Sequence, residues 1–210
     1  MSQFSDWTKT KLDKRFGIEE LRTLPSLENW LNGVAEITDI ERIVLNEYQG
    51  LLRDNADGWN EQELALNFIG PVFGLVKYGH SRKFNFFAER SFSGVVDGEE
   101  MTGNPDGTIA KGFREPEKPY FCFHEYKKDI DYSGDPAGQC LAPMLVAQTL
   151  NDENKPIFGC YVVGRTWRFL VLQHKKYAIS DSYIATQDDI YDIFRILKVL
   201  KIYVTTDLNL

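Results

Sequence analysis

The sequence predicts an α/β fold in which helices flank a central mixed β-sheet. Two observations lead to this prediction. The hydrophobic period changes from helical to extended near Lys83, and an uncharged helical segment at residues 136–150 separates two groups of extended segments. The chain has 210 residues and 43% hydrophobic content, enough for one sizeable core. We therefore expect a helical N-terminal region, residues 1–58, packed on a core domain of residues 59–210.

Helices are predicted throughout the first third of the chain. Apolar residues at helical spacing, with capping residues at the ends, place them at about residues 7–16, 25–31, 38–53 and 60–79. The third is the best specified, because Thr38 to Glu41 form a capping box. The fourth should be kinked at Gly70-Pro71, because proline removes a backbone hydrogen bond to Asn67.

Extended, aromatic-rich segments follow. They lie at about residues 83–96, 100–110, 120–127, 156–163 and 166–173. Short turns join the first three, which predicts an antiparallel meander. After the third, Asp135 as N-cap and Pro136 begin a helix that should be buried against the sheet, and this crossover makes the fourth strand parallel to a neighbour. A last helix is expected at about residues 187–201.

The third strand carries an acid and a base where an apolar face is expected. In Glu125-Tyr126-Lys127, residues two apart share a face, so Glu125 and Lys127 emerge together, in line with Phe123. Burying either charge alone is costly, so both need partners. The alternative is a solvated strand end, which the following Lys128 and Asp129 support.

Asp106 shifts the balance between these alternatives. It lies in the turn sequence Asn104-Pro105-Asp106-Gly107, but residues 108–110 continue as a strand. In an antiparallel pair joined by the turn at 112–119, Asp106 can lie beside Glu125. Two neighbouring carboxylates repel each other unless a cation lies between them. An all-oxygen site without His or Cys suits Mg²⁺ or Mn²⁺.

Pro105-Asp106 followed by Glu125-Tyr126-Lys127 resembles the signature of the PD-(D/E)xK nuclease superfamily. The element order over roughly residues 60–173 is similar to its restriction-endonuclease-like core. The resemblance implies that Asp106, Glu125 and the Tyr126 carbonyl bind a metal. It also implies that Lys127 orients the attacking water. The expected protein is a Mg²⁺- or Mn²⁺-dependent endonuclease, a hydrolase of phosphodiester bonds that acts on DNA by default.

The same resemblance implies two further site residues. Many members add a helix glutamate, for which Glu63 is preferred over Glu61; the alternative is that Glu63 closes a capping box begun by Asn60. Gln139 matches a glutamine found in some members, and the alternative is a satisfied polar group at a buried helix end. Pro143 replaces the tyrosine that follows in some of these proteins.

The overall charge limits which partners and compartments are expected. A net charge of −7 argues against a free-standing, tight nucleic-acid binder, so a local basic patch, a second copy or another protein would have to supply phosphate affinity. The alternative function is a binding or assembly module with weak or no cleavage.

Three dispersed cysteines favour buried thiols, and no signal-peptide or membrane-spanning segment is visible. We expect a cytoplasmic protein without a membrane partner.

Overall fold

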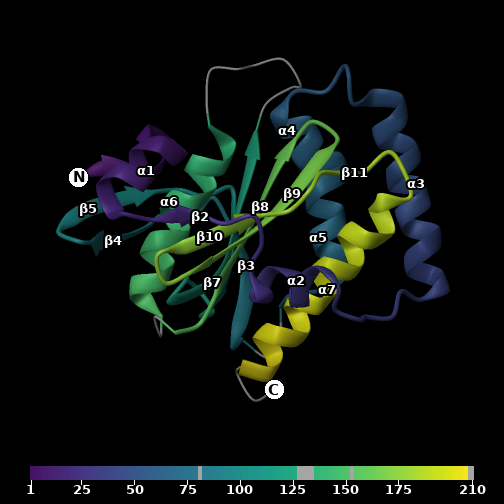
Figure 1. Cartoon of the computed structure of the whole chain (residues 1–210). Helices are drawn as coiled ribbons and strands as arrows, with labels where there is room; N and C mark the ends of the chain where they lie inside the picture. The colour runs from purple at the N-terminus through teal and green to yellow at the C-terminus, as the bar shows by residue number, and fades with distance from the viewer. Residues whose placement is uncertain (80–81, 127–134, 152–153, 208–210) are drawn as a thin grey trace.

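The computed structural model describes residues 1–79, 82–126, 135–151 and 154–207, with the backbone alone for 124–126. Within these residues it contains an eight-stranded mixed sheet and a separate three-stranded sheet. Helices cover both faces of the larger sheet (Figure 1). The predicted mixed sheet flanked by helices is therefore confirmed.

The larger sheet is mixed because two of its strand pairs are parallel and the others antiparallel. Its strands, in spatial order, are β2 (Glu19–Glu20), β10 (Lys176–Ile179), β9 (Thr166–Gln173), β8 (Ile157–Val163), β7 (Lys118–Tyr126), β6 (Gly107–Lys111) and β3 (Phe84–Ala88), with β11 (Tyr183–Ile184) also paired to β9. The parallel pairs are β7 with β8 and β10 with β2. The expected parallel crossover between β7 and β8 is confirmed, whereas β2, β10 and β11 are short strands that the sequence patterns did not predict.

Five helices pack on one face of this sheet. They are α2 (Pro25–Leu31), α3 (Asp39–Asn55), α4 (Glu61–Leu64), α5 (Gly70–Val76) and α7 (Asp189–Asp207). Trp30 of α2 is fully buried there, and its ring meets those of Phe158 and Phe169 at centroid distances of 4.9 and 5.2 Å. Its indole N–H donates to the carbonyl of Ile196 on α7. The aromatic residues thus tie two helices to the strands beneath them.

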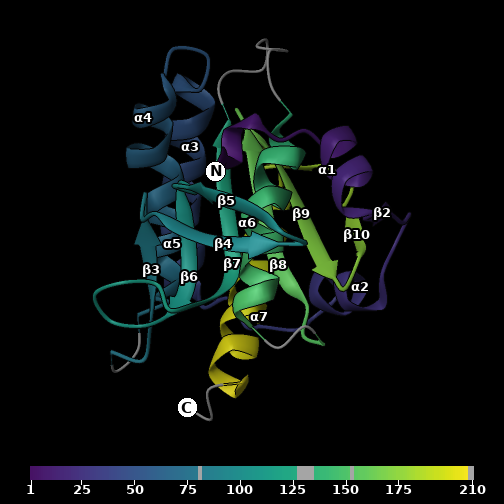
Figure 2. The same ribbon diagram turned by 90° about the vertical axis from the view of Figure 1, so that its left-hand side faces the viewer.

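Helix α6 (Pro136–Leu150) packs on the other face and lies between the two sheets (Figure 2). The smaller sheet consists of β1 (Ser2–Gln3), β5 (Glu99–Gly103) and β4 (Phe92–Val96), and it is flanked by the 3₁₀ turn η1 (Phe4–Asp6) and by α1 (Lys9–Phe16). A Cβ atom at Gly94 of β4 would lie 2.8 Å from Val146 of α6. Residues 140–148 of α6 are all buried between the two sheets, which explains why α6 has no charged residue and confirms the predicted burial.

Local capping determines most helix ends as expected. Thr38 and Glu41 form the predicted capping box of α3, and Asp135 caps α6 by accepting a hydrogen bond from the Gly138 N–H. Gly17 ends α1 in the left-handed conformation, at a φ of 62°. The exception is α7, which continues to Asp207 because its last turns still bury apolar residues such as Val204.

A π-helical turn lies where the sequence predicts a kink. Residues Ala65–Ile69 (η2) form this turn between α4 and α5, directly before Gly70-Pro71. The Gly70 N–H reaches back to the carbonyl of Ala65, which is the spacing of a π-helix. The helix ends at Lys77, at a φ of 61°, so the expected end at Gly79 is two residues late.

The expected three-strand meander is wrong. The 83–96 segment divides into β3 and β4, and the 100–110 segment divides into β5 and β6. Strand β3 pairs with β6 in the larger sheet, while β4 and β5 form a hairpin in the smaller one. A positive φ angle at Glu89 (51°) turns the chain at the end of β3, and positive φ angles at Asp97 (45°) and Gly98 (81°) form the turn of the β4–β5 hairpin. In the first segment, β3 and β4 each begin with phenylalanine and are rich in aromatic or β-branched residues, so composition does not show that they belong to different sheets.

The N-terminal region contributes to both faces of the larger sheet. Helix α1 packs against α6, whereas α2 and α3 join the core formed with α5 and α7. The two faces therefore depend on the same first third of the chain. Within the described residues, no helix is both long enough and apolar enough to cross a membrane.

Candidate functional site

A cavity of about 790 Å³ lies at the end of the larger sheet where β3 ends, β6 begins and β7 passes through Phe123. Among the described residues, its polar lining consists of Glu61, Gln62, Glu89, Asp106 and Gln139. Aromatic and aliphatic side chains, including those of Phe86, Phe123 and Leu66, form the rest of the wall. The cavity therefore combines carboxylates and amides with apolar surface.

Asp106 reaches this cavity from a bend directly before β6. The Glu89 N–H donates to the Asp106 carbonyl at 3.2 Å, which ties the bend to the end of β3. The next residue, Gly107, pairs with Phe123 on β7. A Cβ atom at Gly107 would lie 2.5 Å from the ring of Phe86. Glycine thus allows the aromatic ring to close against the strand, and the bend carrying Asp106 is held on both sides.

Strand β7 continues past this cavity as far as Tyr126. Its backbone pairs with β8, with Glu125 opposite Val162. Position 125 is two residues beyond Phe123, and alternation along a strand assigns both positions to the same face. The Glu125 side chain and all of Lys127 lie outside the described residues, so the predicted approach of Glu125 and Lys127 to Asp106 stays a prediction.

The helix before β3 presents Glu61, and not the preferred Glu63, to the cavity. The Glu63 carboxylate accepts a hydrogen bond from the Asn60 N–H at 2.8 Å, and Asn60 Oδ1 accepts one from the Glu63 N–H at 2.9 Å. This is the capping box that the sequence offered as the alternative. Residues two apart on a helix do not face the same side, so a Glu63 directed back to its cap leaves Glu61 toward the cavity.

Gln139 reaches the cavity from the first turn of α6. Asp135 positions this turn, because one carboxylate oxygen caps Gly138 and the other accepts a hydrogen bond from the Lys9 N–H at 2.6 Å. The Gln139 amide also donates to the Ser5 carbonyl at 3.5 Å. The predicted glutamine therefore lines the same cavity as Asp106, and it also contacts the N-terminal segment.

The thiol nearest the site is buried. Cys140 Sγ lies 3.5 Å from the Cys160 carbonyl and 3.6 Å from that of Cys122, and all three cysteines are free and buried. Burial raises the pKa of Cys140 to about 12, and the charge of Asp106 adds to this. A thiol held in its protonated form is a poor metal ligand. The predicted buried thiols are confirmed, and oxygen atoms are the available donors.

Glu89 is a third carboxylate of the cavity that the sequence patterns did not predict. It is exposed, and its φ of 51° turns the chain at the end of β3. The charged pair Glu89-Arg90 interrupting an aromatic run was the available signal for a strand end.

Among the side chains that the structure describes, no three His, Cys, Asp or Glu residues gather closely enough to hold a metal ion.

A smaller cavity of about 380 Å³ lies elsewhere, between β7, β8 and α7. Its walls include Tyr120, Phe158 and Tyr203, and an ion pair between Lys155 and Asp207 lies at its edge. Burial raises the pKa of Tyr120 to about 12, and the Asp207 charge adds to this. Its aromatic lining lacks the convergent carboxylates of the larger cavity.

No family can be assigned to the chain by comparison with known proteins. No protein-family model matches the chain, and no curated protein matches it. The chemistry of the larger cavity is therefore judged from its own residues. Among the described residues, those are three carboxylates and two amides beside the end of β7.

Proposed function

We propose that this protein is a metal-dependent phosphodiesterase with a restriction-endonuclease-like core, acting on nucleic acid and by default on DNA. One observation carries the proposal. A single cavity gathers Asp106, Glu61 and Gln139 beside the end of β7, the strand that carries Glu125 and ends at Tyr126, directly before Lys127 in the sequence. The order of β3, β6, β7 and β8, with α6 crossing between β7 and β8, supports the same core.

The donor chemistry of the cavity suits Mg²⁺ or Mn²⁺. The carboxylates of Asp106 and Glu61 and the amide oxygen of Gln139 are hard oxygen donors, and Cys140 stays protonated. On β7, Glu125 and the Tyr126 carbonyl would complete the set. When bound there, the ion would lower the pKa of a coordinated water and neutralise phosphate charge.

The residues of the chain itself would bind and orient the substrate. Lys127 would orient the attacking water and stabilise the charge that develops on the phosphate oxygens. Gln139 would orient a phosphate or water through its amide, since it already lies in the wall of the cavity. The rings of Phe86 and Phe123 would keep bulk water away from the reacting group, which strengthens these electrostatic interactions.

A cleavage assay on plasmid and single-stranded DNA with Mg²⁺ or Mn²⁺ tests the proposal. We expect the wild type to cleave only when metal is added, and Asp106→Ala and Lys127→Ala to be inactive. Glu63→Ala is the matched control. It removes a carboxylate from α4, the helix that also carries Glu61, but this carboxylate serves as a helix cap. Binding of Mn²⁺, followed by electron paramagnetic resonance, should weaken in Asp106→Ala and not in Glu63→Ala.

Two results would overturn the proposal. Equal cleavage by all four proteins would identify a contaminating nuclease. An inactive wild type that also fails to bind Mn²⁺ would favour the second candidate, a nuclease-fold module that binds nucleic acid or protein without cleaving. The net charge of −7 is the observation that favours this second candidate.

A further inference from the structure

Five exposed basic residues gather at the opposite end of the same three strands from the cavity. We call them the basic rim: Arg82, Lys83, Lys111, Arg114 and Lys118. Two precede β3, one ends β6, one lies in the β6–β7 connection and one begins β7. They are distant in sequence but adjacent in space, because β6 pairs with both β3 and β7.

Backbone pairing holds the rim together. Lys111 lies directly opposite Lys118 on β7 and directly opposite Phe84 on β3. The Lys83 carbonyl accepts a hydrogen bond from the Gly112 N–H at 3.1 Å, which places Lys83 beside the same strand end. Like charges directly opposite each other on paired strands are destabilising. A position that accepts this cost is suited to binding an anion.

An aromatic contact adds to the rim. The Arg82 guanidinium lies over the ring of Phe113, 4.8 Å from its centroid, and Phe113 is itself 51% exposed. Stacking of this kind limits the motion of the guanidinium while leaving its N–H groups available to a ligand. Exposed basic side chains interleaved with an aromatic ring are typical of surfaces that bind nucleic-acid backbones.

The rim differs from the other basic cluster of the chain, on α1. There, Lys9 pairs with Glu20 at 3.0 Å, and Arg15 pairs with Glu99 at 3.6 Å. Within the described part of the chain, no rim residue forms an ion pair with an acidic side chain. Residues 82–83 and 111–118 contain five basic and two acidic residues, a local charge of +3 in a chain of −7.

We propose that the basic rim binds the phosphates of a nucleic acid whose cleaved bond lies in the Asp106 cavity. This inference rests on the function proposed above. Phe123 lies five residues beyond Lys118 on β7, which corresponds to about 17 Å along a strand. At roughly 3.4 Å per base pair, the rim would contact phosphates about five base pairs from the cut. The rim supplies the basic surface that an acidic nuclease needs.

Binding of a fluorescent duplex of about 20 base pairs, measured by anisotropy without Mg²⁺ or Mn²⁺, tests the rim. The double variant Lys111→Gln/Lys118→Gln should bind roughly tenfold more weakly, and the slope of log affinity against log salt should fall by about 2 in magnitude. The control, Lys11→Gln/Lys14→Gln, makes the same charge change on α1. Helix α1 lies on the opposite side of the molecule from β3 and β6 (Figure 2). The control variant should bind the duplex with an affinity within about twofold of that of the wild type.

The outcomes separate this inference from the proposed function. Equal losses in the two double variants would contradict the rim, because the effect would then follow net charge alone. If the wild type cleaves with Mg²⁺ and the rim variant binds and cleaves equally well, the rim is wrong and the nuclease stands. If the rim variant weakens binding but the wild type never cleaves, the nuclease is wrong and the rim stands as a nucleic-acid surface. Melting temperatures of both variants check that they fold.

Discussion

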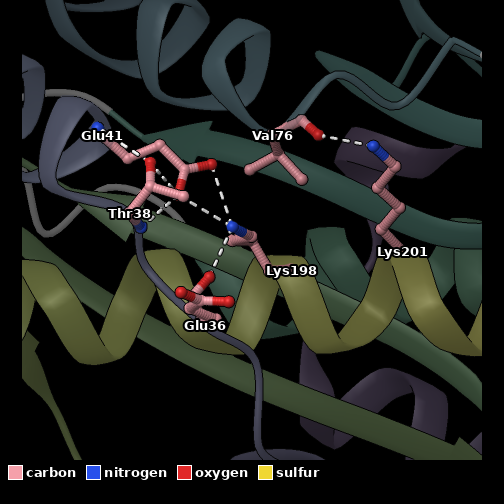
Figure 3. Close-up of polar contacts among 6 residues, drawn as sticks. All are labelled: Glu36, Thr38, Glu41, Val76, Lys198 and Lys201. Atoms are coloured by element: carbon pink, nitrogen blue, oxygen red, sulfur yellow. Dashed lines mark hydrogen bonds and ion pairs between the residues drawn. The ribbon is translucent and has the colours of Figure 1, made fainter.

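Lys198 on α7 donates hydrogen bonds to both carboxylate oxygens of Glu41 on α3, at 2.9 and 2.8 Å (Figure 3). The same ammonium group donates to the Glu36 carbonyl. Glu41 also closes the capping box of Thr38, so one carboxylate joins the start of α3 to the last helix. One turn further along α7, Lys201 donates to the Val76 carbonyl at the end of α5. Two lysines thus hold α7 against helices that lie far earlier in the chain.

This arrangement predicts a pH-dependent contribution to stability. Burial acts to raise the pKa of Glu41, but the hydrogen bonds from Lys198 and Thr38 outweigh it, and the pKa lies below its ordinary value of 4.5. The stabilisation is therefore present above that ordinary value and is lost as the pH falls through the lowered pKa. Glu41→Gln keeps an acceptor for the cap and removes the charge. It should lower the free energy of unfolding by about 1 kcal/mol at neutral pH.

Urea unfolding of the wild type and Glu41→Gln across the acidic range measures this contribution. The two free energies of unfolding should converge as the pH falls below the lowered pKa of Glu41, because the carboxyl group is then protonated in the wild type too. A constant difference at every pH would show that the interaction with Lys198 does not depend on charge.

The two glutamates of α4 should separate catalysis from stability. Glu61→Gln removes a carboxylate from the cavity, and we expect metal-dependent cleavage to fall roughly 10- to 100-fold with little change in melting temperature. Glu63→Ala removes a cap, and we expect a loss of about 1 kcal/mol in the free energy of unfolding with cleavage largely retained. Cleavage rates and melting temperatures of both variants show which glutamate contributes to catalysis and which to stability. The reverse pattern would restore Glu63 as the site residue.

Close packing of α6 against β8 predicts a large effect from one methyl group. A Cβ atom at Gly159 would lie 2.5 Å from Met144 Sδ and 3.1 Å from Cys140 Sγ. Gly159→Ala should therefore destabilise the protein by about 1–3 kcal/mol. Gly50→Ala in α3 is the matched control, since nothing lies within 4 Å of its Cβ, and it should stabilise the helix by about 0.5–1 kcal/mol. Chemical denaturation of both variants tests this, and equal shifts would contradict the packing.

The buried thiols should be unreactive in the folded protein. Cys122, Cys140 and Cys160 are fully buried, and burial raises the pKa of each. Ellman's reagent at neutral pH should therefore label the protein only as fast as it unfolds, and fully in denaturant. Rapid labelling of one thiol without denaturant would show that the interface of α6 with the sheet opens locally.

Much of the fold could be predicted from sequence features that act within a few residues. Capping at Thr38 and Asp135, and the left-handed end at Gly17, act within a few residues of each helix terminus; the two predicted caps and the predicted helix end at residue 16 are confirmed. The strand pairing from residue 83 to 110 was not predicted correctly. The strand with which an extended segment pairs depends on residues far away in the chain. Strand β4 pairs outside the larger sheet although its composition resembles that of β3.

The candidate site, too, could be predicted only in part from the sequence. Asp106 and Gln139 were singled out from sequence, and they line one cavity. The choice between Glu61 and Glu63 depended on whether the Glu63 side chain turns back to Asn60, and its capping hydrogen bond shows that it does. Glu89 had no sequence signal beyond a charged interruption, because it reaches the cavity through the turn at the end of β3.

The sequence by itself determined where most helices begin and end, that α6 would be buried, and that Asp106 and Gln139 are candidate site residues. Each of these follows from interactions within a few residues or from the cost of burying charge. Only the tertiary structure decided which strands pair, which helix glutamate lines the cavity with Asp106, and that Lys111 and Lys118 meet in one basic rim. These depend on contacts between segments far apart in the chain, whose register no local pattern specifies.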